Sequence, residues 1–222
     1  MGLSDKLSVT LTAGIAFWVL RPLGASWRMR FPQRVALENK LKRGEKFLLA
    51  FWHGEYLPLF ISLRGLTGCV FTSDSFRGRV IQRLCSHFGF ACEILAGSYQ
   101  QRQAQLVHAA YRYPAIALAV DGPLGPFHVI KPGAISTATT TQIPIIPIVC
   151  HCRRQWTSRK RWDRFAVPKP FTTVAVVISE PIVVLNRNDT EQDDKSITVL
   201  AQALEQLEHD AAILSAEAKI SP

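Results

Sequence analysis

Six short apolar runs recur through this chain, and they constrain its fold more than any other feature of the sequence. They span Phe47–Trp52, Cys69–Thr72, Ala91–Leu95, Ala115–Val120, Ile145–Val149 and Val174–Ser179. Nearly continuous hydrophobicity over so few residues is typical of strands that are buried on both faces, as in parallel sheets. We therefore expect these runs to form a mostly parallel mixed sheet.

The segments between the runs place apolar residues at the spacing of amphipathic helices. These residues are Val80, Ile81, Leu84, Cys85 and Phe88, then Val107, Ala110 and Tyr111, and near the end of the chain Leu200, Leu204, Leu207, Ala211 and Leu214. Strands that alternate with helices predict an α/β fold, and 222 residues are enough for one such domain with its own core. The polar stretch Asn186–Lys195 is predicted to be a surface loop.

An apolar run from Leu7 to Leu20 precedes the predicted sheet. As a helix it would rise only about 21 Å, less than the roughly 30 Å hydrocarbon core of a bilayer. Arg21 and Pro22 follow it in place of a small-residue cleavage site, so we expect neither a cleaved signal nor export. We predict a membrane-associating apolar helix and a basic connector over residues 1–34, and the α/β domain over residues 35–222. The alternative is a first helix that covers the core of the domain.

The chain is basic, with a formal net charge of +9 and a pI of about 9.6, and this balance favours anionic partners. The densest basic run, Arg153–Arg164, also contains Trp156 and Trp162. Tryptophan among cations is typical of an anionic membrane surface, although it also suits single-stranded nucleic acid or a solvated loop. Because the run matches no nucleic-acid-binding motif, we expect a membrane surface as partner and no nucleic acid.

The cysteines favour a reducing compartment and argue against a metal site. There are five of them, an odd number that is scattered through apolar segments, which predicts buried thiols and no disulfide framework. Cys150-His151-Cys152 has the residue types of a zinc site. Adjacent strand residues point to opposite faces, however, and no second pair of ligands follows, so we expect no metal.

Polar side chains gather where three of the predicted strands end. The segments are Trp52-His53-Gly54-Glu55, Thr72-Ser73-Asp74-Ser75 and Asp121-Gly122-Pro123-Leu124-Gly125-Pro126. Ligands of open parallel sheets bind beyond the carboxyl ends of the strands, so we expect one shared cleft. His53 is placed as a general base would be, directly after a strand and with a glycine beside it, and histidine is the residue type most often used as a base near neutral pH. A lone histidine, however, is more often structural. Asp121 begins a rigid turn. Three hypotheses are open for this aspartate: it binds a substrate hydroxyl, it orients the histidine, or it only forms the turn.

The order of these segments carries a resemblance to a known family. In order, the matching pieces are Trp52-His53-Gly54, Thr72-Ser73-Asp74-Ser75, Gly97-Ser98, Asp121-Gly122-Pro123-Leu124-Gly125-Pro126 with Lys131-Pro132-Gly133, Pro144-Ile145-Ile146-Pro147, Trp162-Asp163-Arg164-Phe165 and the Pro168–Pro170 turn. Together they resemble the lysophospholipid acyltransferase superfamily, and most closely its DUF374 branch, over residues 35 to 185. The ordered set is far more specific than any single piece.

The resemblance implies a glycerolipid acyltransferase-like fold and an enzyme that moves a fatty acyl group to a hydroxyl of a membrane lipid. The implied donor is an acyl-thioester, either acyl carrier protein or acyl-CoA, and the implied acceptor is a lipid A precursor or a lysophospholipid. No metal or organic cofactor takes part in this chemistry. The expected location is the cytoplasmic face of the inner membrane, as a peripheral or monotopic protein.

Two departures from the family pattern open questions about the site. The superfamily has an Asp five residues after its histidine, where this chain has Pro58, so Glu55, Asp74 and Asp121 become candidates for the carboxylate that assists His53. The branch also has an Arg where this chain has Leu124. The residues then expected to bind substrate are Trp52, Gly54, Ser73, Ser75, Arg77, Arg79, Gly97, Ser98, Arg102, Gly122, Pro123 and Gly125. Backbone N–H groups around Gly54 or Gly122 are candidate oxyanion donors.

Two other functions remain open on the sequence. Pro58 in the place of the usual Asp fits a non-catalytic protein that binds a membrane lipid or lipopolysaccharide. A weaker alternative is a nucleic-acid-binding protein that uses Arg153–Arg164.

Overall fold

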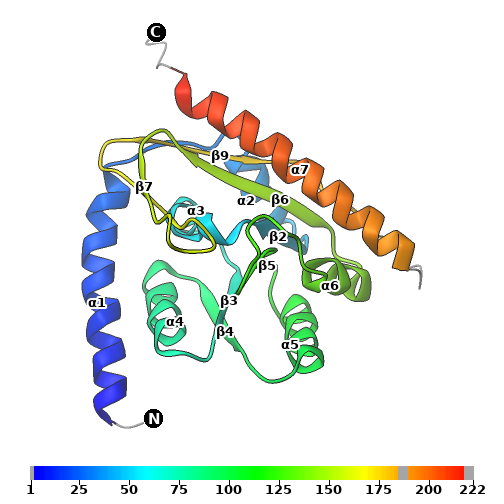
Figure 1. The fold of residues 1–222 in the computed structure, drawn as a ribbon, viewed down its shortest axis with the longest axis horizontal. Helices are drawn as coiled ribbons and strands as arrows, with labels where there is room; N and C mark the ends of the chain where they lie inside the picture. The colour runs from blue at the N-terminus through cyan, green and yellow to red at the C-terminus, as the bar shows by residue number, and fades with distance from the viewer. Residues whose placement is uncertain (1–2, 185–189, 218–222) are drawn as a thin grey trace.

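The structure, a computed structural model, describes residues 3–184 and 190–217 and has a seven-stranded sheet at its centre (Figure 1). The strand order is β1-β9-β6-β2-β5-β3-β4. The strands are β1 (Arg28–Arg30), β2 (Phe47–Phe51), β3 (Cys69–Ser73), β4 (Ala91–Leu95), β5 (Ala115–Ala119), β6 (Ile145–Cys152) and β9 (Thr173–Ile178). All neighbouring strands are parallel except β6 and β9. The predicted α/β fold with a mostly parallel mixed sheet is therefore confirmed.

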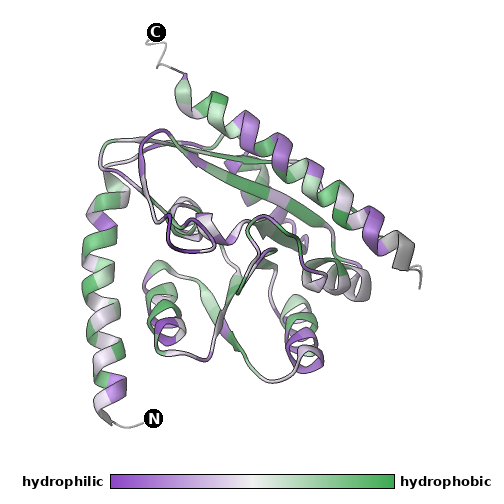
Figure 2. Cartoon of the chain, viewed as in Figure 1, coloured by the Kyte–Doolittle hydropathy of each residue, from purple (hydrophilic) through white to green (hydrophobic). Residues whose placement is uncertain are grey.

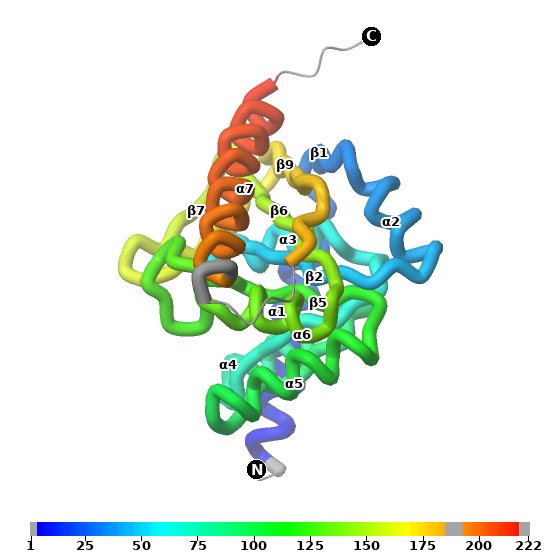
Figure 3. The backbone as a smooth tube through the Cα atoms, turned by 90° about the vertical axis from the view of Figure 1, so that its right-hand side faces the viewer, coloured from blue at the N-terminus to red at the C-terminus, as the bar shows by residue number. Residues whose placement is uncertain are grey.

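Side chains of the central strands alternate between two apolar cores, one on each face of the sheet. Leu48 and Ala50 of β2 point into the core covered by α5 (Tyr99–Arg112), α6 (Gly133–Thr141) and α7 (Thr190–Ala216). Phe47 and Leu49 point into the other core, which α2 (Arg34–Lys42) and α3 (Tyr56–Ser62) cover. Figure 3 shows α7 running along β6 and β9. Burial on both faces explains why these strands are apolar throughout.

Helix caps account for several residues of the predicted site. Ser75 caps the N-terminus of α4 (Phe76–Phe88), where its side chain accepts a hydrogen bond from the N–H of Gly78. Ser98 and Gln101 form a capping box at the start of α5. Gly97 before it has a φ of 88°, which favours glycine. Gly97 and Ser98 therefore have a structural reason to be in the sequence, because they start a helix.

The N-terminal helix α1 (Leu3–Ala25) is apolar on two opposite sides. One side packs on α4, where the Phe17 and Phe88 rings lie 5.3 Å apart. The opposite side exposes Leu7, Leu11, Ile15, Trp18 and Val19. Figure 2 shows apolar residues along the length of this helix.

Helix α1 is longer than the sequence analysis expected. It continues through Arg21 and Pro22 to Ala25, and its stretch Ser4–Ala25 is long and apolar enough to cross a membrane by length and composition. Only 17% of that stretch is buried. The expectation that the helix is too short to span was therefore wrong, because helical structure extends beyond the purely apolar run at both ends.

Three further segments differ from the sequence-based expectation. Within the basic run, β7 (Gln155–Thr157) pairs with β8 (Ala166–Pro168) in a two-stranded antiparallel ribbon. Of the predicted loop 186–195, residues 190–195 already belong to α7, whereas 186–189 lie outside the described residues. The connector after α1 contributes β1, which pairs with β9, so the sheet includes residues on the N-terminal side of the predicted boundary at 34.

Candidate active site

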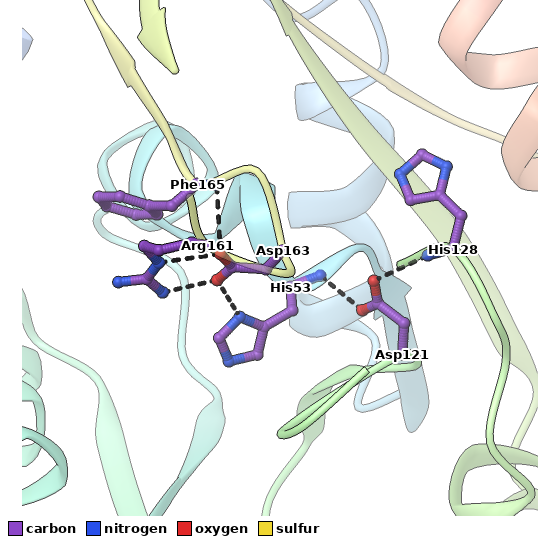
Figure 4. A network of polar contacts seen from close by, with 6 residues as sticks. All are labelled: His53, Asp121, His128, Arg161, Asp163 and Phe165. Carbon is purple, nitrogen blue, oxygen red and sulfur yellow. Dashed lines mark hydrogen bonds and ion pairs between the residues drawn. The ribbon is translucent and has the colours of Figure 1, made fainter. Parts of the chain in front are cut away.

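His53 lies directly beyond the carboxyl end of β2, at the start of a 3₁₀ turn (His53–Glu55) that leads into α3. Its backbone N–H donates a hydrogen bond of 2.8 Å to Oδ1 of Asp121, which follows β5. The other oxygen of Asp121 accepts from the N–H of His128 at 3.3 Å (Figure 4). Asp121 is completely buried, and it fixes the backbone of His53 without contacting the imidazole ring.

The carboxylate that contacts the imidazole ring is Asp163. Nδ1 of His53 lies 2.8 Å from Oδ2 of Asp163, whose side chain is fully buried, whereas 26% of the His53 side chain is exposed. An ionised carboxylate only accepts hydrogen bonds, so Nδ1 carries the proton and Nε2 keeps its lone pair. A histidine in this tautomer is ready to take a proton at Nε2.

Arg161 keeps Asp163 ionised. Its Nε and Nη2 donate to the two oxygens of Asp163 at 2.9 Å and 2.6 Å, and the N–H of Phe165 donates to Oδ1 at 3.2 Å. Burial acts to raise the pKa of Asp163, but the hydrogen bonds and charges of Arg161 and His53 outweigh it and lower the pKa to about 2. Asp163 is thus an anion at neutral pH, and it favours the imidazolium that His53 would form on taking a proton.

Two glycines allow the parts of the site to approach closely. A Cβ on Gly54 would overlap the carbonyl oxygen of Asp163, and a Cβ on Gly122 would lie 2.9 Å from Cδ2 of His53. Both residues therefore have a packing reason to be glycine. The N–H of Gly122 donates to the carbonyl of Ala119 at 3.3 Å, so it is not free to bind an oxyanion, in contrast to the expectation from sequence.

The other carboxylates suggested by the sequence serve elsewhere. Glu55 is half-buried and accepts a 2.8 Å hydrogen bond from the N–H of Cys150, and desolvation of its carboxylate raises its pKa well above the ordinary value. Asp74 is exposed and forms an ion pair of 2.6 Å with Arg79. Within the described parts of the chain, neither contacts the His53 ring, so assigning Glu55, Asp74 or Asp121 as its partner was wrong.

His53 borders a large cavity of about 1240 Å³, which exceeds the roughly 300–1,000 Å³ of typical ligand pockets. Most of its wall is apolar and includes Leu37, Phe47, Leu49, Leu59, Leu63, Leu66, Phe71, Ile81, Leu106 and Ile116. Of the residues suggested by the sequence, it brings together His53, Ser73, Ser75, Arg77, Arg102, Gly122 and Pro123. This cavity is the shared cleft expected beyond the strand ends.

The cavity reaches into both layers of the fold because β3 and β5 diverge. The two strands pair only at Cys69 with Ile116 and at Val70 with Ala117. Residues beyond this point on both strands, 71–73 and 118–120, line the cavity. No sequence pattern announces such a divergence, since both strands are apolar along their whole length.

Asp163 is not in the wall of the large cavity but in that of a smaller one of about 340 Å³. Trp52, Gly54 and Glu55 line it, together with His128 and His151. His151 contacts Ser215 at 2.8 Å through Nδ1.

Among the described residues there is no group of three or more His, Cys, Asp or Glu side chains that could hold a metal ion, and the five cysteines are free thiols.

Six of the residues expected to bind substrate are not in the wall of the large cavity: Trp52 and Gly54 line the smaller cavity, and the others are Arg79, Gly97, Ser98 and Gly125. Gly97 and Ser98 start α5, and Arg79 pairs with Asp74. Gly125 has a φ of 70° and packs against Trp162, which does line the cavity. Gly97, Ser98 and Arg79 therefore have structural roles, whereas Gly125 is next to the site through its contact with Trp162.

Asp163 and Arg161 belong to the candidate site, and neither was among the site residues predicted from the sequence. Asp163 lies 110 residues after His53, in the loop between β7 and β8, so local spacing gives no indication of the contact. Two signals were available: Asp163 lies in Trp162-Asp163-Arg164-Phe165, one of the pieces that carry the family resemblance, and it is the single acidic residue in the basic run Arg153–Arg164. A lone carboxylate among so many cations indicates a specific partner.

Comparison with known proteins supports the fold described above. Comparison with family models and with curated protein sequences finds no match. Among solved structures, the chain is similar to the crystal structure of the 1-acyl-sn-glycerophosphate (LPA) acyltransferase, PlsC, from Thermotoga maritima. The TM-score is 0.55, the sequences are 13% identical, and the match covers 95% of this chain and 80% of that one. At this identity the likeness establishes the fold, which is the predicted acyltransferase-like α/β fold, and leaves function to the residues of the site.

Proposed function

We propose that this protein is an acyltransferase that moves a fatty acyl group from an acyl-thioester to a hydroxyl of a membrane lipid. The observation that carries the proposal is the pair of His53 and Asp163 beside a large apolar cavity. A base with an orienting carboxylate suits activation of a hydroxyl, and an apolar cavity suits a hydrocarbon chain. The acyltransferase-like fold supports the same class of reaction.

In the proposed reaction, Nε2 of His53 accepts the proton of the acceptor hydroxyl while the oxygen attacks the thioester carbonyl. Asp163 holds the ring in place and stabilises the imidazolium. Collapse of the tetrahedral intermediate breaks the C–S bond, and His53 returns the proton to the leaving thiolate. The products are an ester of the acceptor and a free thiol, so no metal or redox cofactor takes part in the balance.

Helix α1 supports a membrane lipid as the acceptor. Its exposed stripe of Leu7, Leu11, Ile15 and Trp18 has no protein to cover it in the described structure, and apolar surface of this kind is stabilised by lipid. We further propose that the protein works at the cytoplasmic face of the inner membrane and takes its acyl group from acyl carrier protein or acyl-CoA. The free thiols fit a reducing compartment, and the net charge of +9 fits an acidic carrier and anionic lipid.

The non-catalytic alternative loses its main support. It was based on Pro58 at the position of the usual carboxylate, but Pro58 is buried in α3 and Asp163 supplies a carboxylate to the same histidine. The proposed acceptor classes are still a lipid A precursor or a lysophospholipid.

The direct test is acyl transfer by His53→Ala and Asp163→Asn in membranes with a labelled acyl donor. We expect His53→Ala to lose activity by about 10³-fold or more, and Asp163→Asn by about 10²–10⁴-fold, because the ring loses its orienting anion. Asp210→Asn, on the exposed side of α7, is the matched control and should keep full activity. Unchanged transfer by His53→Ala would overturn the proposal, and a larger loss in Asp74→Asn than in Asp163→Asn would overturn the pairing.

A further inference from the structure

Arg161 lies beside His53 and has hydrogen-bonding capacity that its partner does not use. Its Nε and Nη2 bind Asp163, whereas Nη1 donates to no acceptor within the described parts of the chain. The side chain is 30% exposed and lines the same large cavity as His53. Figure 4 shows the guanidinium and the imidazole reaching the same carboxylate.

The guanidinium lies near the His53 ring and is held in a fixed orientation. Oδ2 of Asp163 is 2.6 Å from Nη2 of Arg161 and 2.8 Å from Nδ1 of His53, so the two nitrogens are separated by no more than the sum of these distances. The guanidinium carbon lies 4.8 Å from the centre of the Phe165 ring, which stacks on Tyr56 at 4.9 Å. An arginine fixed in this way loses little side-chain entropy when it binds a ligand.

The charge of the cavity favours an anionic group. Arg77, Arg102, Lys131 and Arg161 line it, and of the described residues in its wall none is an Asp or Glu. Asp163, which does not line this cavity, forms an ion pair with Arg161 and offsets part of its charge. Four cations beside an apolar wall suit an amphiphile with an anionic head, because the low dielectric next to the wall strengthens the attraction.

We propose that Arg161 binds the anionic group of the acceptor, a phosphate monoester in the first instance, next to the hydroxyl that reacts at His53. Naming the hydroxyl as the reacting group rests on the proposed function, whereas binding of the anion does not. Arg161 is then a binding residue for the substrate and also a positioning residue for Asp163. Phosphate and carboxylate share one planar guanidinium, which can donate to both through different N–H groups.

Binding of dodecyl phosphate to the full chain in mild detergent tests the anion site without any turnover. We expect Arg161→Gln to weaken binding at least tenfold, because a charge-assisted hydrogen bond contributes about 1.5–3 kcal/mol and a tenfold change corresponds to about 1.4 kcal/mol. Arg159→Gln removes the same charge from an exposed position in the same loop and should bind as the parent protein does. Arg161→Lys keeps the charge but loses the planar fork that serves both groups, so it should bind more weakly than the parent and more tightly than Arg161→Gln.

Controls separate anion binding from damage to the site. Arg161→Gln leaves the buried Asp163 without its main cationic partner and should unfold at a lower temperature, so binding is measured where unfolding scans show every variant to be folded. The affinity of each variant for the neutral amphiphile dodecyl maltoside should not change. Equal affinity of Arg161→Gln and the parent for dodecyl phosphate would overturn the inference, as would an equal loss for the neutral amphiphile. Coenzyme A also carries phosphate, and if its binding depended on Arg161 more strongly than that of dodecyl phosphate, the donor and not the acceptor would be the source of the anion.

Turnover then distinguishes this inference from the proposed function. With an acyl-CoA donor, Arg161→Gln should raise the KM for 1-acylglycerol phosphate at least tenfold but not the KM for the phosphate-free monoacylglycerol. An equal fall in kcat for both acceptors, with unchanged KM, would show that Arg161 only positions Asp163. If the parent binds dodecyl phosphate through Arg161 yet transfers no acyl group to any acceptor, the anion site stands and the proposed function fails.

Discussion

Two buried aspartates fix His53, and each has a separate task. Asp121 accepts hydrogen bonds from the backbone of His53 and of His128, so it ties the end of β2 to the loop after β5. Asp163 accepts from the ring and is itself held by Arg161. Since one carboxylate sets the backbone and the other sets the imidazole, the position and the tautomer of His53 are determined independently.

Removing the charge of Asp163 should give a pH-dependent loss of stability. The pKa of Asp163 is depressed to about 2, below the roughly 3.9 of an unfolded chain. Such a group stabilises the fold above its unfolded pKa, and this contribution is lost as the pH falls through the folded pKa. We expect Asp163→Asn to be less stable than the parent by about 2 kcal/mol at neutral pH, with the difference shrinking below about pH 4 and vanishing near pH 2. Denaturant unfolding across this range measures it, and a difference independent of pH would contradict the assignment.

The sequence predicted the parts of the site that follow strands and missed the part that a distant loop supplies. His53 and Asp121 come directly after β2 and β5, and parallel strands bring such positions together. Asp163 reaches His53 only because the β7–β8 loop folds back over the end of β2, and sequence separation hides that contact. Asp74 follows a strand as well, but it is placed on the solvent side and pairs with Arg79.

Strands and helices with long apolar patterns could be predicted from the sequence, whereas short or polar elements could not. All six predicted strands are present, because burial on both faces leaves a continuous apolar run. Helix α6 was missed because its sequence, Gly133–Thr141, is rich in Ser and Thr and gives no clear amphipathic pattern. The strands of the β7–β8 ribbon are too short and too polar to be told from a loop.

Helix α1 is the element on which membrane association should depend. The exposed side chains of Leu11 and Ile15 do not contribute to packing on α4, so replacing both with Asn should leave the unfolding temperature nearly unchanged. Lipid contact would be lost, and burial of two such side chains is worth enough to lower the partition coefficient roughly tenfold or more. Flotation with vesicles of anionic lipid measures the change. Thr12→Gln, an exposed polar position of the same helix, is the control, and equal flotation of both variants would show that α1 is not the lipid contact.

At the scale of the whole molecule, the cavity depends on the divergence of β3 from β5 and is lined from both layers of helices. Its apolar wall is the expected site for the acyl chain.

Ala117, at the point of divergence, lines the cavity, so a larger side chain there would fill part of it. We expect Ala117→Phe to reject the longest acyl donors while short donors still react. Initial rates with acyl-CoA donors of increasing length test this expectation, and an equal loss at every length would instead indicate a general disturbance of the fold.

His53 and Asp163 stand on parts of the fold that differ in stability, and this difference bears on how the proposed activity would be lost on heating. His53 stands on the central strand β2, whereas Asp163 stands between the two strands of a peripheral ribbon with only three residues in each. Small peripheral units open locally at a lower free energy than the whole fold does. Each such opening would withdraw the anion from the imidazole while the sheet stays intact. We therefore expect the contact between His53 and Asp163 to report local opening of the ribbon, and the proposed activity to be lost on heating before the core unfolds.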